Sequence, residues 1–229
     1  MNLYIVSTPI GNLQDITLRA LEAILNSPVI VTESTSKFGN LIALAEATLN
    51  KKRIEDQKII SFSEDEEDQK LPQIINLLER YDVTLVSEAG TPLISDPGFK
   101  LVREAIKRDL NVVSIPGATA PIAALTTSGL PTDKFFFVGY LPKKEGKRTE
   151  LLTNLSEIKI KIGFTLIMFE SPHRLIDSLN SIKQAFGNID IVVAREITKV
   201  HEEVRREKVS EAIIHFGKHT PRGEFVILI

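Results

Sequence analysis

The sequence contains no cysteine and no tryptophan, and neither acidic nor basic residues dominate it. Without cysteine the chain can form no disulfide and no cysteine-ligated metal centre, which is typical of proteins that work in a reducing compartment. The 28 Lys and Arg residues and the 30 Asp and Glu residues give a formal net charge of -2. This balance excludes the strong positive field of proteins that bind nucleic acid tightly and unspecifically, but a local basic patch remains compatible with it.

Long apolar runs are also absent. No stretch approaches the ~18 consecutive apolar residues that a membrane-spanning helix needs. The first residues enter a strand-like segment directly, without the basic and apolar regions of a signal peptide. We therefore expect a cytoplasmic protein without a membrane partner, and the 229 residues are enough for one large or two small α/β domains.

In the first half of the chain, short β-rich runs alternate with segments of helical spacing. Strands are expected at 4–7, 29–31, 59–62, 83–86 and 112–115, and helices at 15–25, 37–49, 71–80 and 98–108. Asp15 stands where the first helix would be capped. Such alternation predicts right-handed βαβ crossovers and a mostly parallel sheet.

The pattern changes after Pro116 and Gly117. Helices are expected at 118–128, 173–186 and 210–216, and β segments at 135–139, 164–169, 191–194 and 225–229. These β segments are less evenly interleaved with helices, which indicates some antiparallel pairing. We expect an α/β protein of two domains, 1–116 with a mostly parallel sheet and 117–229 with a mixed sheet.

Three turn-rich loops follow expected strands, at 8–12, 88–98 and 116–119. In open parallel sheets, ligands bind beyond the carboxyl ends of the strands, so these loops predict one small-molecule site. The loops match neither GxxxxGK[ST] nor GxGxxG, and they contain no lysine to compensate a triphosphate. Carboxylate, hydroxyl and amide groups instead suit a ligand with an ammonium group and a ribose, and S-adenosylmethionine has both, together with a sulfonium.

Six segments carry a resemblance to a known family. They are TPIGNLQDITLRAL at 8–21, SEAGTPLISDPG at 87–98, IPGATAPIAALTTSGLPTDKFFFVGYLP at 115–142, ESPHRL at 170–175, AREITK at 194–199 and GEFVIL at 223–228. In order and spacing they resemble the ribosomal RNA small-subunit methyltransferase I family, which belongs to the tetrapyrrole methylase-like superfamily. The resemblance covers almost the whole chain.

The resemblance implies a homodimer of two-domain subunits, with S-adenosylmethionine in the cleft between the domains. It also implies methyl transfer to the ribose 2′-hydroxyl of a cytidine in the decoding region of 16S rRNA, free or in the small ribosomal subunit, without a metal. The cofactor contacts that it implies are Pro9, Gly11, Gly90, Thr91, Ser95, Asp96, Phe99, Ala118, Thr119, Phe169 and Ser171.

A ribose hydroxyl is a poor nucleophile at neutral pH, so methyl transfer needs a proton acceptor beside it. The candidate catalytic residues are Glu88, Glu170, Arg195, Glu196 and Lys199. For Glu170 the alternative is a helix cap, and for Arg195 and Lys199 it is a solvent-facing salt bridge.

An RNA acceptor needs cationic side chains for its phosphates. The candidate RNA contacts are Lys143, Lys144, Lys147, Arg148, His173 and Arg174, and a second basic patch is formed by Arg205, Arg206 and Lys208. A solvated loop is the alternative for both patches.

Three segments depart from the family pattern, and they lie where an acceptor would bind. Residues 33–36 read Glu-Ser-Thr-Ser instead of Glu-Asp-Thr-Arg, residues 63–66 lack the usual His-Asn pair, and Glu88 replaces an aspartate. Two other hypotheses therefore stay open. One is a methyltransferase of the same fold that acts on a tetrapyrrole or another small molecule, and the other is an inactive cofactor-binding protein associated with the ribosome.

Overall fold

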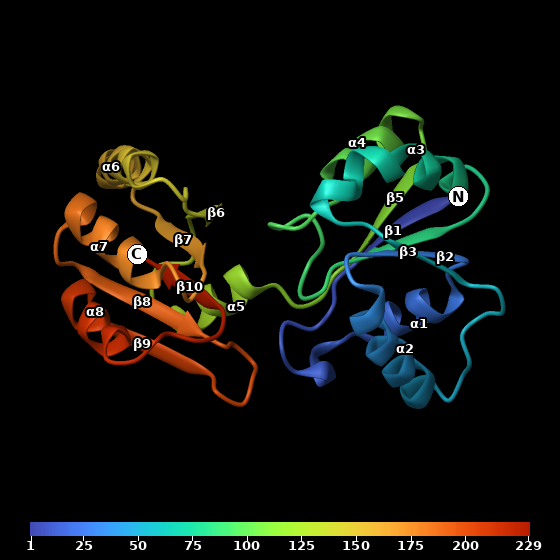
Figure 1. The fold of residues 1–229 in the computed structure, drawn as a ribbon, viewed down its shortest axis with the longest axis horizontal. Helices are drawn as coiled ribbons and strands as arrows, with labels where there is room; N and C mark the ends of the chain where they lie inside the picture. Colours follow the sequence, from blue (N-terminus) through green and yellow to red (C-terminus); the bar gives the residue numbers. More distant parts are fainter. The chain divides into compact units, whose positions relative to one another are not determined.

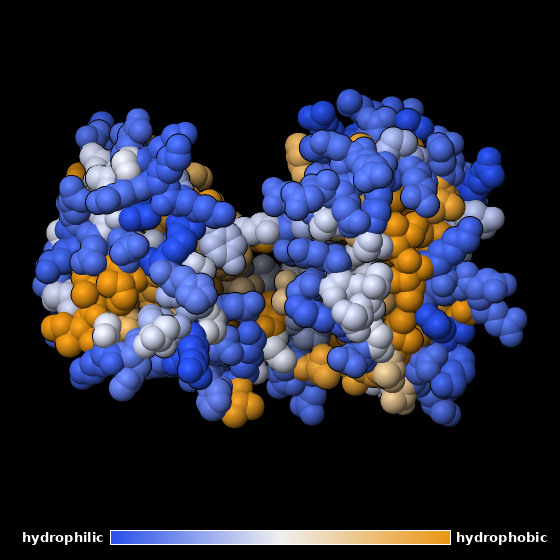
Figure 2. All heavy atoms as spheres, viewed as in Figure 1, coloured by the Kyte–Doolittle hydropathy of each residue, from blue (hydrophilic) through white to orange (hydrophobic).

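The computed structural model describes all residues, 1–229, and the chain divides into two compact units (Figure 1). The first unit spans Met1–Thr119 and the second spans Ala120–Ile229. Hydrophilic residues cover much of the visible surface of each unit (Figure 2). No helix has the length and apolar character needed to cross a membrane.

The first unit is built on a five-stranded sheet in which every neighbouring pair is parallel, in the order β3-β2-β4-β1-β5. The strands are β1 (Asn2–Val6), β2 (Val29–Thr32), β3 (Lys58–Ser61), β4 (Val83–Val86) and β5 (Asn111–Ile115). The helices between them are α1 (Leu18–Asn26), α2 (Thr35–Leu49), α3 (Glu67–Leu78) and α4 (Phe99–Lys107). The strands are apolar on both faces because helices cover both faces.

The side-chain alternation of β2 illustrates this arrangement. Val29 and Val31 pack into the core beneath α3 and α4, whereas Ile30 packs against α1 and α2. Figure 1 shows these two helix pairs on opposite sides of the first sheet. Because all the strands are parallel, their carboxyl ends lie at one edge of the sheet.

Two helix starts differ from a simple sequence reading. Thr17, not Asp15, caps α1, because its hydroxyl accepts a hydrogen bond from the Ala20 amide at 3.1 Å, while residues 13–15 form a separate 3₁₀ turn. The N-terminus of α4 has no local cap. Instead the buried carboxylate of Glu67 accepts from the amides of Gly98 and Lys100, at 3.1 and 3.3 Å. This contact fixes the end of the 87–98 loop to α3.

The second unit has a mixed sheet in the order β6-β7-β10-β8-β9. Its strands are β6 (Phe135–Tyr140), β7 (Thr165–Glu170), β8 (Asp190–Arg195), β9 (Glu203–Lys208) and β10 (Phe225–Leu228). The β6–β7 pair is parallel and the three other pairs are antiparallel. The expected fold class, a parallel first sheet and a mixed second one, is confirmed.

Four helices cover the second sheet. They are α5 (Ala120–Ser128), α6 (Glu145–Ile162), α7 (Leu175–Phe186) and α8 (Val209–Gly217). The larger core lies between the sheet and α6, α7 and α8, and a smaller core lies beneath α5 on the other face.

The sequence pattern missed α6 and β9. Helix α6 exposes Ile158, Ile160 and Ile162 and buries Arg148, so its apolar residues do not form one clear stripe. Strand β9 is an edge strand of mainly charged residues, in which Arg205 pairs with Glu207 at 2.6 Å. Charged side chains on an edge strand are a common protection against pairing with another chain.

Candidate active site

The three turn-rich loops of the first unit meet at the carboxyl edge of its sheet. The loop after β1 pairs with the loop after β4 through an isolated antiparallel bridge between Thr8 and Gly90, with N–O distances of 2.8 and 3.1 Å. Because β1 and β4 are neighbours, their loops leave the sheet side by side. The predicted convergence of these loops is therefore present within the first unit.

The loop after β5 joins the same group through Thr91. The Thr91 hydroxyl lies 2.9 Å from the Ser7 hydroxyl and donates to the Ala118 carbonyl at 3.1 Å. Gly117 packs so closely on the first loop that a Cβ there would lie 2.9 Å from the Ser7 Cβ. One threonine thus ties all three loops together, and a larger residue than glycine at 117 would force them apart.

The backbone of the 87–98 loop is strained. Leu93 and Ser95 have φ angles of 72° and 66°, in the left-handed region that L-residues seldom occupy. Gly98 has a φ of 123° and turns the chain into α4. Strained backbone of this kind clusters at functional sites, where the surrounding structure enforces it.

Three carboxylates interact electrostatically at this edge. The pKa of Asp96 is raised from its ordinary value of 3.8 to about 6, mainly by burial and also by the neighbouring charges of Glu33 and Glu88, while a hydrogen bond from Ser87 opposes the rise. Burial and the Glu88 charge likewise raise the pKa of Glu33. The nearby cation is Lys37 of α2, which forms an ion pair with Glu88. The edge therefore has an excess of negative charge that a cationic ligand would relieve.

The other candidate residues of this unit lie around the same loops. Pro9 and Gly90 are buried, Ala118 and Thr119 are half-buried, and Gly11, Ser95 and Phe99 are exposed. Glu88 is exposed to solvent apart from its ion pair with Lys37.

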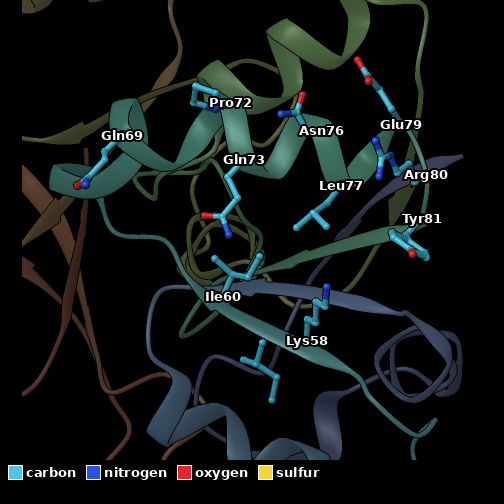
Figure 3. Close-up of a pocket in the computed structure, with 11 residues that line it drawn as sticks. Lys58, Ile60, Gln69, Pro72, Gln73, Asn76, Leu77, Glu79, Arg80 and Tyr81 are labelled. Carbon is cyan, nitrogen blue, oxygen red and sulfur yellow. The ribbon is translucent and has the colours of Figure 1, made fainter.

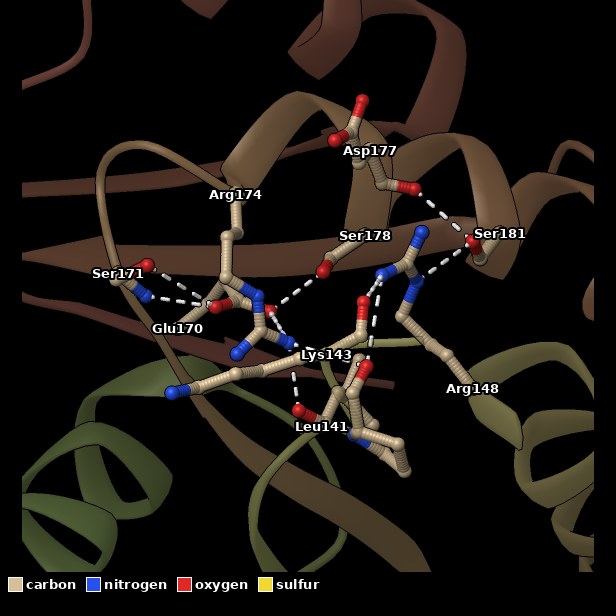
Figure 4. A network of polar contacts seen from close by, with 10 residues as sticks. Leu141, Lys143, Arg148, Glu170, Ser171, Arg174, Asp177, Ser178 and Ser181 are labelled. Carbon is tan, nitrogen blue, oxygen red and sulfur yellow. Dashed lines mark hydrogen bonds and ion pairs between the residues drawn. The ribbon is translucent and has the colours of Figure 1, made fainter. Parts of the chain in front are cut away.

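In the second unit, Glu170 ends β7 and is fully buried (Figure 4). Its carboxylate accepts a hydrogen bond from the Ser171 amide at 2.8 Å and from the Ser178 hydroxyl, and it lies 3.4 Å from the Arg174 guanidinium. These contacts fix the turn between β7 and α7. This structural role resembles the helix cap that was the alternative to a catalytic role for Glu170. With its oxygens occupied inside the protein, Glu170 is a poor candidate for a proton acceptor.

The two neighbours of Glu170 that were expected at the cofactor are half-buried. Phe169 lies in an aromatic cluster, with ring-centroid distances of 4.9 Å to Phe137 and 5.5 Å to Tyr140. Ser171 is committed through its amide to the Glu170 carboxylate.

The candidate RNA contacts divide into exposed and buried groups. Lys143, Lys144, Lys147 and His173 are exposed. Arg148 is only 5% exposed, and its guanidinium donates to the Ser181 hydroxyl at 2.9 Å, so it cannot serve as a surface phosphate contact. The sequence did not indicate that Arg148 is buried, because it ends a charged segment in which every side chain was expected to face solvent.

The second basic patch is engaged within the protein. Arg205 pairs with Glu207, Arg206 donates to the Ser128 carbonyl at 2.9 Å, and Lys208 pairs with Asp190 at 2.7 Å. These cations stabilise β9 and its neighbours, and we do not include them among the RNA contacts.

Arg195, Glu196 and Lys199 come together in the turn after β8. The Lys199 ammonium bridges Glu196 at 3.0 Å and Glu224 at 2.8 Å, and Arg195 lies 3.5 Å from Glu203. Glu196 has a φ of 50°, and its carboxylate also accepts from the Glu224 amide at 3.0 Å. The turn is thus a strained, ion-paired junction between the AREITK and GEFVIL segments, and each charge already has a partner.

Gly223 is indispensable to this junction. Its φ is 94°, and a Cβ there would lie 2.6 Å from the Glu196 Cγ. We expect Gly223→Ala to lower the free energy of unfolding by about 2–4 kcal/mol, since left-handed backbone costs ~1–2 kcal/mol and overpacking ~1–3 kcal/mol. Chemical denaturation would measure the loss.

Two further variants control this prediction. Gly146→Ala, in a helix with open space around it, should be neutral or slightly stabilising. Adding Glu196→Ala removes the atoms that the new methyl group meets, so the Gly223→Ala loss should shrink in that background. An equal loss in both backgrounds would show that the contact with Glu196 is not its cause.

A separate cavity of about 1070 Å³ lies beside α3 and β3 (Figure 3). It is lined by Lys58, Ile59, Ile60, Gln69, Pro72, Gln73, Asn76, Leu77, Glu79, Arg80 and Tyr81. None of the candidate site residues lines it. No cluster of His, Cys, Asp and Glu suited to a metal ion is present.

Sequence reasoning missed the residues that hold these sites in place. Ser7 and Lys37 contact the loops of the first unit, and Glu224 and Ser178 hold charges in the second. Glu224 lies in GEFVIL, one of the segments that carry the family resemblance, so the sequence did carry a signal for it. That it meets Lys199 of AREITK could not be read from the sequence, because the contact depends on the register of β8 and β10.

Comparison with known proteins identifies the family. A model described as Tetrapyrrole (Corrin/Porphyrin) Methylases matches residues 2–213. Proteins named Ribosomal RNA small subunit methyltransferase I are 40% identical in Rickettsia prowazekii and in Thermotoga maritima. Both matches cover 99% of this chain, with 77% of the first relative and 97% of the second.

Solved structures agree with this fold. A diphthine synthase superimposes with a TM-score of 0.74 at 14% identity, covering 100% of this chain and 89% of that one. The cobalt precorrin-4 methyltransferase of cobalamin biosynthesis has a TM-score of 0.68 at 17% identity, covering 99% and 94%. With relatives at 40% identity over nearly its full length, the chain belongs to the tetrapyrrole methylase family and, within it, to the ribosomal RNA small subunit methyltransferase I proteins.

Proposed function

We propose that this protein transfers the methyl group of S-adenosylmethionine to the ribose 2′-oxygen of a cytidine in the decoding region of 16S rRNA. The coarser function, S-adenosylmethionine-dependent methylation of small-subunit ribosomal RNA, rests on the names and full-length coverage of the relatives. The observation that carries the proposal to this chain's own residues is the anionic, lysine-poor loop cluster at the carboxyl edge of the first sheet.

The chemistry of that loop cluster fits the cofactor. When bound, S-adenosylmethionine supplies a methyl group activated by a positively charged sulfur. Asp96, whose raised pKa reports an environment that disfavours negative charge, would gain a favourable partner in a cationic ligand. Gly90, Thr91 and Ala118 are retained as proposed cofactor contacts, and their hydrogen bonds within the loop cluster hold the loops in shape beside Asp96. Phe169 and Ser171 are retained as proposed contacts from the second unit.

Glu88 is the carboxylate that we assign as proton acceptor for the ribose hydroxyl. It is exposed beyond the carboxyl end of β4, separated from the strand by Ser87 alone. Its pairing with Lys37 places a counter-charge beside it. Glu170, Glu196 and Arg195 are engaged within the protein, so we assign them to the stability of the site and not to proton transfer.

The exposed lysines at the start of α6 are the proposed RNA contacts. Lys143 and Lys144 precede the helix and Lys147 lies in its first turn, where the helix dipole is positive. None of the three forms an ion pair with an acidic side chain in the protein. Positive lysine side chains beside the positive end of the helix dipole repel it, and a bound phosphate would reduce this repulsion. His173 is exposed at the start of the neighbouring α7 and extends this surface.

The function can be tested with purified protein and labelled S-adenosylmethionine. The acceptors are small ribosomal subunits that lack the modification, protein-free 16S rRNA and a free tetrapyrrole. We expect label on a cytidine ribose of the rRNA, in one or both forms. Label on the tetrapyrrole alone would support the small-molecule alternative, and cofactor binding without label in any acceptor would support an inactive protein. Sedimentation of the same protein tests the homodimer that the resemblance implies.

A further inference from the structure

Two arginines hold the main chain just before the basic segment, which we define as Lys143–Lys147. Arg174 donates to the carbonyl oxygens of Leu141 and Pro142, at 2.5 and 3.3 Å. Arg148 approaches the same Pro142 carbonyl at 3.5 Å and the following one, of Lys143, at 3.4 Å. Three consecutive carbonyl groups are therefore turned inward onto guanidinium groups.

Both guanidinium groups are themselves fixed. Arg174 is anchored by the buried Glu170 carboxylate at 3.4 Å, and Glu170 is held in turn by Ser171 and Ser178. Arg148 is anchored by Ser181 of α7, whose hydroxyl donates to the Asp177 carbonyl at 3.0 Å. Figure 4 shows this chain of contacts, with the Lys143 side chain running away from Arg148.

This arrangement explains why a buried charge is present here at all. Burying a carboxyl group and guanidinium groups costs desolvation energy, and apolar residues of similar volume would often stabilise a protein equally well. A planar guanidinium, however, presents its N–H donors in one fixed plane, so it holds a carboxylate and main-chain carbonyls more rigidly than the flexible ammonium of a lysine would, and apolar residues cannot hold them at all. The carbonyl contacts of both arginines all lie on residues 141–143, so they hold this one loop.

We propose that Arg174, anchored by Glu170, is a positioning residue for rRNA binding. By holding the Leu141 and Pro142 carbonyls inward, it presents Lys143, Lys144 and Lys147 outward as one rigid phosphate-binding surface. Arg174 itself makes no phosphate contact. This role deepens the proposed function and rests on it, because it takes rRNA as the ligand of the basic segment.

The first test needs no RNA. In Arg174→Lys, a cation remains near Glu170 while the guanidinium nitrogen that reaches the Leu141 and Pro142 carbonyls is lost. We expect hydrogen exchange of the amides in 141–148 to become faster, with the rest of the second unit unchanged. Arg206→Lys is the matched control, because Arg206 holds the carbonyl of Ser128 at the C-terminal end of α5. It should loosen that end of α5 alone. Unchanged exchange in 141–148 would overturn the positioning role, whatever the protein's activity.

The second test measures affinity for small ribosomal subunits as a function of salt. Arg174→Lys should raise the Kd by about tenfold and flatten the salt dependence, because phosphate contacts dominate both quantities. A variant with Lys143, Lys144 and Lys147 all replaced by Gln should do the same. The combined variant should be no worse than the lysine variant alone, and the affinity for S-adenosylmethionine should stay unchanged throughout.

The outcomes separate the two proposals. Additive losses in the combined variant would show that Arg174 binds phosphate directly, and the positioning role would be wrong. If the wild-type protein does not bind subunits or rRNA at all, the proposed function fails, while the exchange experiment still decides the structural part. Glu170→Gln gives an independent check, since it weakens the anchor and leaves Arg174 in place, and we expect it to reproduce the Arg174→Lys pattern more weakly.

Discussion

Asp96→Asn should make the protein more stable at pH 7 and weaken its binding of S-adenosylmethionine. The carboxylate is desolvated and faces Glu33 and Glu88, so its ionised form is costly in the folded protein until a cation arrives. Asparagine keeps the shape and removes the charge. We expect the cofactor Kd to rise by about 30-fold or more. This corresponds to about 2 kcal/mol, the lower end of the binding energy lost when one partner of a desolvated charge pair is removed.

The stability gain has a definite pH dependence. Above pH 6 the carboxylate is ionised in both states, and the folded state bears the full cost. Between pH 6 and 3.8 the folded protein binds a proton that the unfolded chain does not, so the cost fades as pH falls. A pKa of about 6 against 3.8 sets an upper limit of about 3 kcal/mol, and solvent screening of this partly exposed group reduces it to about 1–2 kcal/mol. The advantage of the variant should vanish below about pH 4.

Calorimetry and denaturation at pH 7 and pH 4 measure the two effects. Asp133→Asn, an exposed aspartate in the second unit, should change neither quantity. Wild-type cofactor affinity in Asp96→Asn would remove Asp96 from the site. A variant that is less stable at pH 7 would show that the Ser87 hydrogen bond outweighs desolvation.

Glu88→Gln should lower kcat by ~10²- to 10⁴-fold, the usual contribution of a positioned base. The amide cannot accept the proton of the ribose hydroxyl, whereas the loop that carries it is pinned by Thr8, Gly90 and Thr91 and should keep its shape. Binding of S-adenosylmethionine should remain within about threefold of wild type.

Lys37→Met is the matched control for Glu88. It breaks the same ion pair and leaves the carboxylate in place. If Glu88 acts as the base, Lys37→Met should reduce kcat much less than Glu88→Gln does. Equal losses would mean that Glu88 acts only by holding Lys37, and an unchanged kcat in Glu88→Gln would assign the base elsewhere.

The fold was predictable where local pattern and tertiary environment agree. β2 and β4 are buried on both faces and lie in mainly apolar runs, so both strands and the parallel character of their sheet followed from the sequence, whereas the pairing of β2 with β4 did not. α6 escaped prediction because three exposed isoleucines and a buried arginine contradict the usual helical pattern. β9 was hidden because an edge strand stabilised by ion pairs has no apolar alternation.

The site was predictable to a lesser extent. The composition of 87–98 indicated a cationic ligand, and the structure adds the carboxylate cluster that gives this reasoning a physical basis. Residues that act through main-chain contacts, such as Thr91 and Arg174, have no sequence signature, because their partners are carbonyl groups far along the chain. Arg148 and Glu170 show the same limit, since no local pattern distinguishes a buried charge from a solvated one.

The most direct test of the central claim is a map of ribose 2′-O-methylation in 16S rRNA from cells with and without this protein. We expect one decoding-region cytidine to lose its methyl group when the protein is absent and to regain it with the wild-type chain, but not with Glu88→Gln. Identical methylation of all decoding-region cytidines in the two cell lines would contradict the account.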